Sequence, residues 1–270
     1  MKKVTVVLAA VLALSASAAL AGQAPQTGVI GSFHDITDNA TYTPDPLQRV
    51  CVFCHTPHNA STAYADAPLW NRTESASANI TPYVWQAPAN LATDATGGNM
   101  SITQADVLTG PTRLCLTCHD GVTAVDQHGP AAGTANLSAA SGTAIDSASG
   151  RAWQDLTTTH PVGFLYSEAL ALRGTGELVD PSTGAEFIDT VDASGVRALN
   201  TYFGTNRLAA KKISDTLYSG RVTCASCHEV HNKDNALNPL ASGAPAGDAR
   251  NYFLRASEER SAICLSCHIK

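Results

Sequence analysis

The chain contains few aromatic side chains for its length. Phe, Trp and Tyr make up only 6% of its 270 residues, whereas small and turn-forming residues such as Ala, Ser, Thr and Gly are abundant. A composition of this kind is poor in the large side chains that fill one extended core. Other apolar material is therefore needed to hold a fold of this length together.

Basic residues and long apolar runs are also scarce. The 17 Lys and Arg are outnumbered by 23 Asp and Glu, giving a formal net charge of −6. Nucleic-acid binding needs a basic face, so this balance argues against nucleic acid as a partner. No apolar run is long enough to cross a bilayer, so no transmembrane segment is expected in the mature chain.

The N-terminus has the pattern of a secretory signal peptide. Lys2 and Lys3 precede an apolar run over residues 4–14, and residues 19–21, Ala-Leu-Ala, form a small-residue cleavage site. We expect residues 1–21 to be removed on export. The loss of two lysines would take the formal charge from −6 to −8.

The eight cysteines form four C-x-x-C pairs, and a histidine follows each pair directly. C-x-x-C-H is the attachment signature of c-type haem. Cysteines three residues apart lie on one side of a helical turn, from which both sulfurs reach the vinyl groups on one porphyrin edge while the histidine binds iron. The predicted attachment residues are Cys51, Cys54, Cys115, Cys118, Cys224, Cys227, Cys264 and Cys267, and the predicted proximal ligands are His55, His119, His228 and His268.

Cysteine pairs also occur in zinc ribbons and in redox-active disulfides. Neither use explains a histidine directly after every pair, and a chain with nine histidines does not place four of them there by chance. The sequence therefore predicts four covalently bound haem c groups. These haems would also supply the apolar mass that the side chains lack.

Five histidines outside the motifs are available as second axial ligands. Once Met1 is lost, Met100 is the only methionine, so at most one haem can have His/Met ligation. Bis-histidine ligation is therefore expected, and it generally gives a lower potential than His/Met ligation.

His58 and His231 have the most informative positions among these five. Each lies three residues after a motif histidine and is followed by asparagine, a spacing that suits the haem of a neighbouring motif. We predict that they, together with His34 and His160, are distal ligands. His128 lies before Gly-Pro, which is typical of a turn, and its role is left open.

The motifs divide the chain into two similar halves. The block that begins at Cys51 resembles the block that begins at Cys224, and Cys115-Leu-Thr-Cys-His resembles Cys264-Leu-Ser-Cys-His, which indicates an internal duplication. The expected organisation is one compact tetrahaem unit with an N-terminal dihaem half (22–129), an Ala/Gly/Ser-rich loop or linker (130–150) and a C-terminal dihaem half (151–270).

Regular secondary structure should be sparse. Pro111 is placed to open a helix through the second motif that ends at Gly121, and residues 205–217 and 256–268 also read as short helices. Residues 86–100 carry few structural signals, and strand signals are weak. The predicted fold class is mostly irregular, with short α-helices, little strand and a haem core.

The chain resembles the paired-CxxCH multihaem cytochromes of metal-reducing bacteria, and with four haems it is similar to their filament-forming extracellular members. The resemblance rests on the 31–35 Gly-Ser-Phe-His-Asp segment, the 51–59 block, 68–72 Pro-Leu-Trp-Asn-Arg, 115–121, 160–164 His-Pro-Val-Gly-Phe and the 224–232 block. It implies a continuous stack of haems and a histidine lent to the neighbouring subunit, for which His34 is the nominated residue.

These patterns favour an electron-transfer protein over an enzyme. The resemblance implies a filament subunit or surface relay outside the cell, whose partners are other redox proteins or copies of itself and whose acceptor is a metal or mineral. A monomeric periplasmic electron shuttle is the alternative that uses the same haems. A multihaem oxyanion reductase would need an open iron position with acid and base groups around it.

Overall fold

A computed structural model of the chain describes all four motifs and parts of the chain between them. The described residues are 29–58, 60–61, 69–72, 80–83, 101–126, 128, 142–146, 152–199, 212–231 and 253–269. The expected signal peptide, the 86–100 segment and most of the expected 130–150 linker lie outside these residues.

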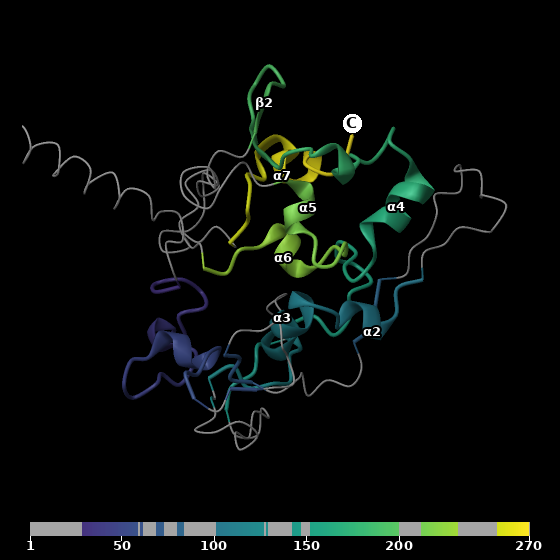
Figure 1. Cartoon of the computed structure of the whole chain (residues 1–270). Coiled ribbons are helices and arrows are strands. Elements are labelled where there is room, and N and C mark those ends of the chain that lie inside the picture. The colour runs from purple at the N-terminus through teal and green to yellow at the C-terminus, as the bar shows by residue number, and fades with distance from the viewer. Residues whose placement is uncertain are drawn as a thin grey trace, which may run out of the picture.

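The described part of the chain is mostly irregular and carries only short helices, as the sequence predicts (Figure 1). The helical elements are η1 (Ile36–Asp38), η2 (Val50–Phe53), α2 (Gln104–Val107), α3 (Pro111–His119), α4 (Tyr166–Arg173), η4 (Pro181–Thr183), α5 (Ile213–Thr216), α6 (Cys224–Cys227), η5 (Glu259–Ser261) and α7 (Ala262–Leu265). Among the described residues, none of them has the length and apolar character needed to span a bilayer.

Helix α3 matches the sequence prediction. Pro111 occupies its first turn, where the missing N–H costs nothing, and Gly121 follows its end with a left-handed φ of 72°. The predicted helix over 205–217 is seen only as α5, because residues 205–211 lie outside the described part.

The predicted helix over 256–268 is shorter than expected. It is divided into η5 and α7, because Arg260 and Ser261 adopt left-handed φ values of 50° and 60°. Left-handed residues cannot continue a right-handed helix, so only one turn remains around the fourth motif.

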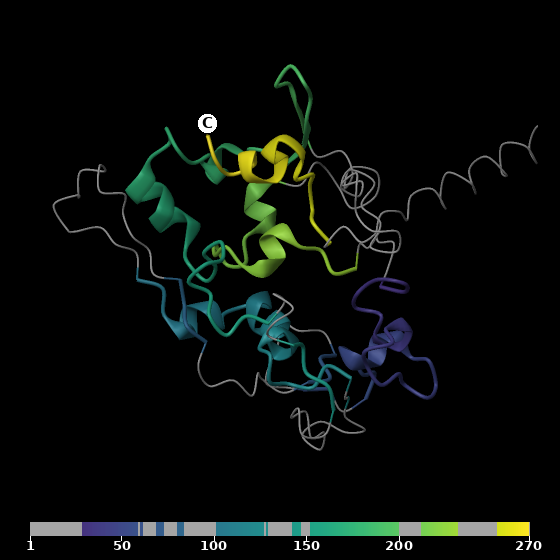
Figure 2. The same ribbon diagram turned by 180° about the vertical axis from the view of Figure 1, so that it is seen from behind.

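Two short strands form an antiparallel hairpin, β1 (Ile188–Val191) with β2 (Arg197–Leu199). The Asp192 carboxylate shapes the turn between them, since its Oδ1 accepts hydrogen bonds from the N–H groups of Ser194 (2.8 Å) and Val196 (2.9 Å). The hairpin projects from the end of the molecule that carries α7 (Figures 1 and 2).

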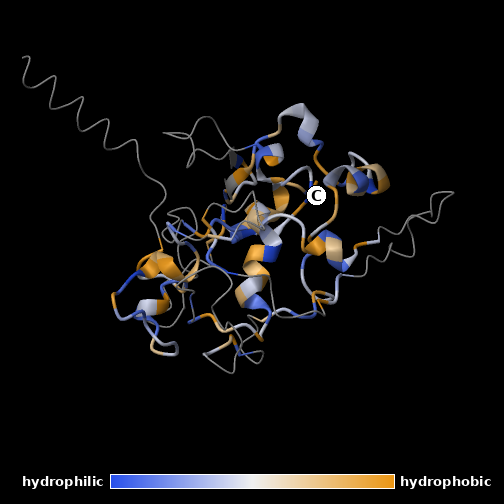
Figure 3. Ribbon diagram, turned by 60° about the horizontal axis from the view of Figure 1, so that its bottom comes forward, coloured by the Kyte–Doolittle hydropathy of each residue, from blue (hydrophilic) through white to orange (hydrophobic). Residues whose placement is uncertain are grey.

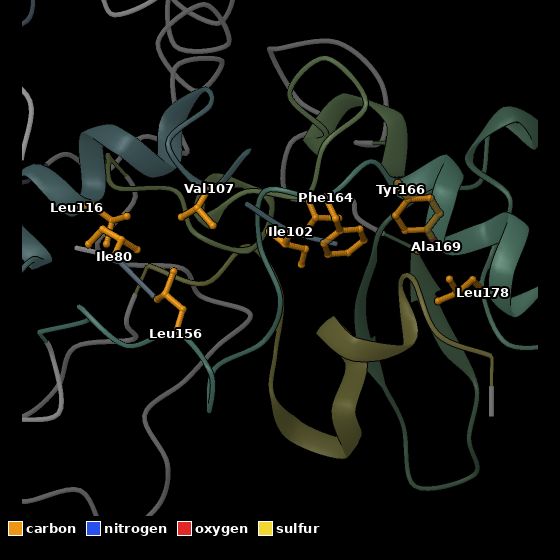
Figure 4. Close-up of a cluster of buried hydrophobic side chains, with 10 residues drawn as sticks. Ile80, Ile102, Val107, Leu116, Leu156, Phe164, Tyr166, Ala169 and Leu178 are labelled. Carbon is orange, nitrogen blue, oxygen red and sulfur yellow. The ribbon is translucent and has the colours of Figure 1, made fainter. Parts of the chain in front are cut away.

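The largest apolar cluster contains residues from both predicted halves. Its buried members are Ile80, Ile102, Val107, Leu116, Leu156, Phe164, Tyr166, Ala169, Leu178 and Val222 (Figure 4). Elsewhere the apolar residues are divided among short segments (Figure 3). Small separate clusters of this kind agree with the low aromatic content of the sequence.

Gly163 allows two segments of this cluster to approach each other. Its φ is 94°, and a Cβ atom there would lie 2.7 Å from the backbone nitrogen of Val107. On its other side, Gly163 donates its N–H to the Val222 carbonyl at 2.7 Å. The absence of a side chain at Gly163 therefore lets this backbone pack directly between Val107 of α2 and Val222, which precedes α6.

Candidate haem-binding sites

Each C-x-x-C-H motif is folded as a single helical turn. In the first, third and fourth motifs, the histidine N–H donates to the carbonyl of the first cysteine at 2.8, 3.0 and 2.9 Å. The second motif lies wholly within α3. All eight cysteines are free thiols. The helical turn therefore places the two sulfurs of each pair on one side, as the spacing predicts.

The backbone after the first motif is repeated after the third. Leu69 and Phe253 have left-handed φ values of 56° and 58°, and each accepts a hydrogen bond from the residue that follows the motif histidine. Two residues further on, the N–H groups of Asn71 and Arg255 both donate to the carbonyl of the motif's second cysteine at 2.8 Å. The geometry around these two motifs therefore repeats, in line with the expected duplication.

The side chains of Asn71 and Arg255 continue the repeat. Asn71 Nδ2 donates to the Val52 carbonyl at 2.6 Å, and Arg255 Nε donates to the Ala225 carbonyl at 2.8 Å. Val52 and Ala225 are both the first residue between the paired cysteines. One side chain thus fixes the same point of each attachment turn.

The buried Arg72 supports the first two motifs. Its guanidinium donates to the carbonyls of Phe53 (3.1 Å) and Ala124, and the side chain is almost completely buried. Its positive charge lies close enough to lower the pKa of the Cys54 and Cys118 thiols, although burial is the larger effect and raises both.

The expected separation of two axial histidines follows from bond lengths. Each iron–nitrogen bond is about 2 Å long and each imidazole centroid lies roughly 1 Å behind its nitrogen, so two rings on opposite faces of one iron have centroids about 6 Å apart. Pairs of histidines at this separation are the arrangement that a bis-histidine haem needs.

Three pairs of histidines that the sequence predicts as ligands have this separation. The ring centroids of His55 and His231 are 6.2 Å apart, those of His119 and His34 are 6.1 Å apart, and those of His268 and His160 are 6.4 Å apart. In each pair one ring belongs to a motif and the other to a predicted distal ligand. The residues present therefore fit haem, since each motif offers two cysteine sulfurs and a histidine, and a second imidazole lies at this separation from three of the four motif histidines.

Aromatic rings lie against members of two of these pairs. Trp70 meets the His55 ring edge-on at 6.0 Å, Trp153 stacks on His119 at 4.7 Å, and Phe253 stacks on His34 at 4.7 Å. The scarce aromatic residues of the chain are thus used to orient imidazoles.

The His34 ring lies beside the His119 ring of the same chain, with their centroids 6.1 Å apart. Burial, together with the charges of His119, His228 and His231, lowers the pKa of His34 to about 3. A neutral imidazole is the form that binds a metal. This placement favours a ligand within the chain, in contrast to the intersubunit role that the family resemblance implies for His34.

His58 and His128 are not brought to a motif histidine in this way. Among the described residues, no ring pairs with exposed His58, whose carbonyl accepts a hydrogen bond from Thr56 Oγ1 at 2.7 Å. His128 Nε2 lies 3.0 Å from the Asp45 carboxylate, and its ring meets Phe53 edge-on at 5.3 Å. His128 therefore packs against Phe53 of the first motif and is not paired with a motif histidine among the described residues.

The four motifs lie in a row, and successive motifs approach each other through their cysteine sulfurs. The Cys54 thiol lies near Cys118, whose charge adds to the burial that raises the pKa of Cys54 to about 12. Next along the row, Cys115 and Cys224 share a hydrogen bond, which raises the pKa of Cys115 and lowers that of Cys224.

The row continues from the third motif to the fourth. Burial, together with the charges of Cys224 and Cys264, raises the pKa of Cys227 to about 11. The motifs thus follow one another in space in the order of the sequence, from the N-terminal end of the described chain to α7 (Figures 1 and 2). Cys51 and Cys264, at the two ends of the row, are the exposed cysteines.

A carboxylate lies beside one of the predicted distal ligands. Glu229 Oε1 is 3.5 Å from His231 Nδ1, and Glu229 Oε2 is 3.1 Å from Arg255 NH1. Burial raises the pKa of Glu229, but the contacts with His231 and Arg255 outweigh it and lower the pKa to about 2. Glu229 is therefore ionised at neutral pH.

Sequence reasoning did not identify Asn71, Arg255 or Glu229 as site residues. Asn71 lies in the 68–72 segment that contributes to the family resemblance, so a signal for it existed. Arg255 has no motif around it, and only the repeated backbone geometry reveals that it occupies the place of Asn71. The described residues contain no group of three or more His, Cys, Asp or Glu side chains that could hold a bare metal ion.

No model of a known protein family matches the chain, and no curated protein sequence matches it.

Proposed function

We propose that the chain is a tetrahaem c-type cytochrome that transfers electrons through a row of bis-histidine haems. The separation of 6.1–6.4 Å in three histidine pairs is the observation that supports this best. When bound, haem iron supplies reversible one-electron chemistry. The cysteines would anchor the porphyrins, the paired histidines would bind the irons, and the buried side chains would exclude water.

The order of the motifs supports transfer along the row. Neighbouring motifs approach through their sulfurs, and the two exposed cysteines lie at the ends. An electron carrier needs neighbouring centres close together and accessible terminal centres. The Cys51 and Cys264 ends are therefore the proposed places of electron entry and exit.

The first test is the haem content of protein exported from a host that matures c-type cytochromes. We expect four covalent haems per chain, measured by pyridine haemochrome absorbance against protein concentration, and an all-low-spin ferric spectrum. A chain without haem, or one that carries zinc at the cysteine pairs, would refute the proposal.

The extracellular filament is the form of this function that the family resemblance favours. Because His34 faces His119, the exposed His58 is the better candidate for a histidine lent to another subunit. Electron microscopy of the extracellular fraction tests this, with a tetrahaem repeat as the expected result. Dispersed monomers in the periplasmic fraction, at high concentration and with full haem content, would instead support the soluble shuttle.

An oxyanion reductase is the alternative of a different class. It requires a haem with one open position. Reduction of nitrite or a sulfur oxyanion by the purified holoprotein, together with a high-spin ferric signal, would favour it over electron transfer alone.

A further inference from the structure

We propose that Glu229 is a positioning residue for His231 and that it lowers the reduction potential of the haem held between His55 and His231. This inference rests on the proposed function, because it concerns an axial ligand of a bound haem. The reduction potential of this one haem would be lower than it would be if no carboxylate lay beside the His231 imidazole.

The Glu229 carboxylate joins two side chains through separate oxygens. Oε1 lies 3.5 Å from Nδ1 of His231 and 3.5 Å from its backbone nitrogen, whereas Oε2 lies 3.1 Å from Arg255 NH1. One oxygen is thus directed at the distal ligand, and the other is held by a cation. This arrangement fixes the carboxylate instead of leaving it free to turn toward solvent.

Arg255 makes this arrangement rigid. Its side chain is 9% exposed, its N–H donates to the Cys227 carbonyl, and its Nε donates to the Ala225 carbonyl. Arg255 is therefore bound to the third attachment turn at two points, one through its backbone N–H and one through its guanidinium. Through Arg255, the third motif holds Glu229 against a histidine that faces the first motif.

The equivalent position in the first block lacks a carboxylate. Thr56 follows His55 as Glu229 follows His228, and the distal candidates His58 and His231 lie two residues further on. The Thr56 hydroxyl donates to the carbonyl of His58 and not to its ring. The repeated blocks therefore give their two distal histidines different surroundings.

An anionic acceptor at Nδ1 changes the ligand strength of His231. A hydrogen bond from Nδ1–H to a carboxylate fixes the tautomer, leaves Nε2 for the iron and makes the imidazole a stronger donor, which favours ferric over ferrous iron. The proton stays on Nδ1, and no bond is made or broken in the one-electron step. Each tenfold preference for the ferric state lowers the potential by about 59 mV.

The test compares three variants of the tetrahaem holoprotein by potentiometric titration and EPR. Glu229→Gln removes the charge and weakens the acceptor. Glu229→Asp keeps the charge but withdraws the oxygen from His231. Glu259→Gln is the matched control, since it removes an exposed carboxylate that also pairs with an arginine, Arg260, at 3.0 Å.

We expect one of the four potentials to rise in both Glu229 variants, with a change in the low-spin EPR signal of that haem, and no such change in the Glu259 variant. A tenfold loss of ferric preference would appear as a rise of about 59 mV. Unchanged potentials in Glu229→Gln, or a wild-type potential in Glu229→Asp, would overturn the inference. Wild-type protein without four haems would instead overturn the proposed function, so the two failures can be told apart. If a Glu229 variant loses haem or unfolds at a lower temperature, Arg255→Lys is used in its place. This substitution weakens the contact with Glu229 but keeps the charges of residues 229 and 255, and it is expected to raise the potential of the same haem.

Discussion

Replacement of His231 by alanine should open the haem of the first motif and leave the ligands of the other three haems unchanged. The rings of His231 and His55 have a centroid separation of 6.2 Å, so under the proposed function the loss of His231 removes the distal ligand of the first haem alone. With four equivalent attachment motifs, about a quarter of the ferric iron should change from low spin to high spin. The total haem content should stay the same, because all eight cysteines remain.

Integrated EPR of the ferric protein measures this fraction directly. His128→Ala is the matched control, because His128 is bound to Asp45 and faces no motif histidine among the described residues. We expect that control to have the same low-spin fraction as the wild-type protein.

A second background tests which haem is affected. In a Cys51→Ala/Cys54→Ala protein, which cannot anchor the first haem, adding His231→Ala should produce no new high-spin iron. If one of the three remaining haems becomes high-spin in that background, His231 serves another haem, and the use of centroid separation to assign ligands is wrong.

Three further predictions concern stability. Tyr166→Phe removes a hydroxyl that donates to the carbonyls of Val179 (2.9 Å) and Cys267 (3.2 Å), and it should lower the free energy of unfolding of the holoprotein by about 1 kcal/mol, measured by denaturant titration. Gly163→Ala places a Cβ atom 2.7 Å from the Val107 nitrogen at a φ of 94°, and it should cost more, about 2 kcal/mol, with a lower thermal midpoint. Asp45→Asn should destabilise the protein at neutral pH, because hydrogen bonds from Arg49 hold the pKa of Asp45 well below its ordinary value of 3.8. The ionised carboxylate therefore stabilises the folded state above pH 3.8, and this stabilisation is lost as the pH falls toward the lower pKa of the folded state. The stability difference between wild type and this variant, followed by thermal melts from neutral pH downward, should therefore shrink below pH 3.8, and a constant difference would contradict the assignment.

Local features of this fold were accessible from the sequence. The spacing of each C-x-x-C-H motif predicts a helical turn, and all four turns are present. Pro111 and Gly121 bound α3 because proline suits the first turn of a helix and glycine suits the left-handed residue after it. Such effects depend on a few neighbouring residues, which is why a single sequence reveals them.

The pairing of ligands was not accessible in the same way. His55 and His231 belong to different halves, and no spacing rule connects them. The intersubunit role implied for His34 came from family resemblance, whereas the structure brings the His34 ring to 6.1 Å from the His119 ring of the same chain. Contacts between distant segments depend on packing of the whole chain, which local patterns do not contain.

The pairing of His55 with His231 has a consequence for how the molecule holds together. An iron bound by both imidazoles would close a loop that runs from residue 55 to residue 231 and would act as a staple between the two halves. In the chain-entropy treatment of cross-links, closing a loop of this length is worth about 5 kcal/mol. The first motif is synthesised early, but its haem can gain the second ligand only after the third motif and His231 have been synthesised. The N-terminal half would therefore gain its final stability from a residue made near the end of synthesis, and truncated chains that stop before His231 should be the most easily degraded.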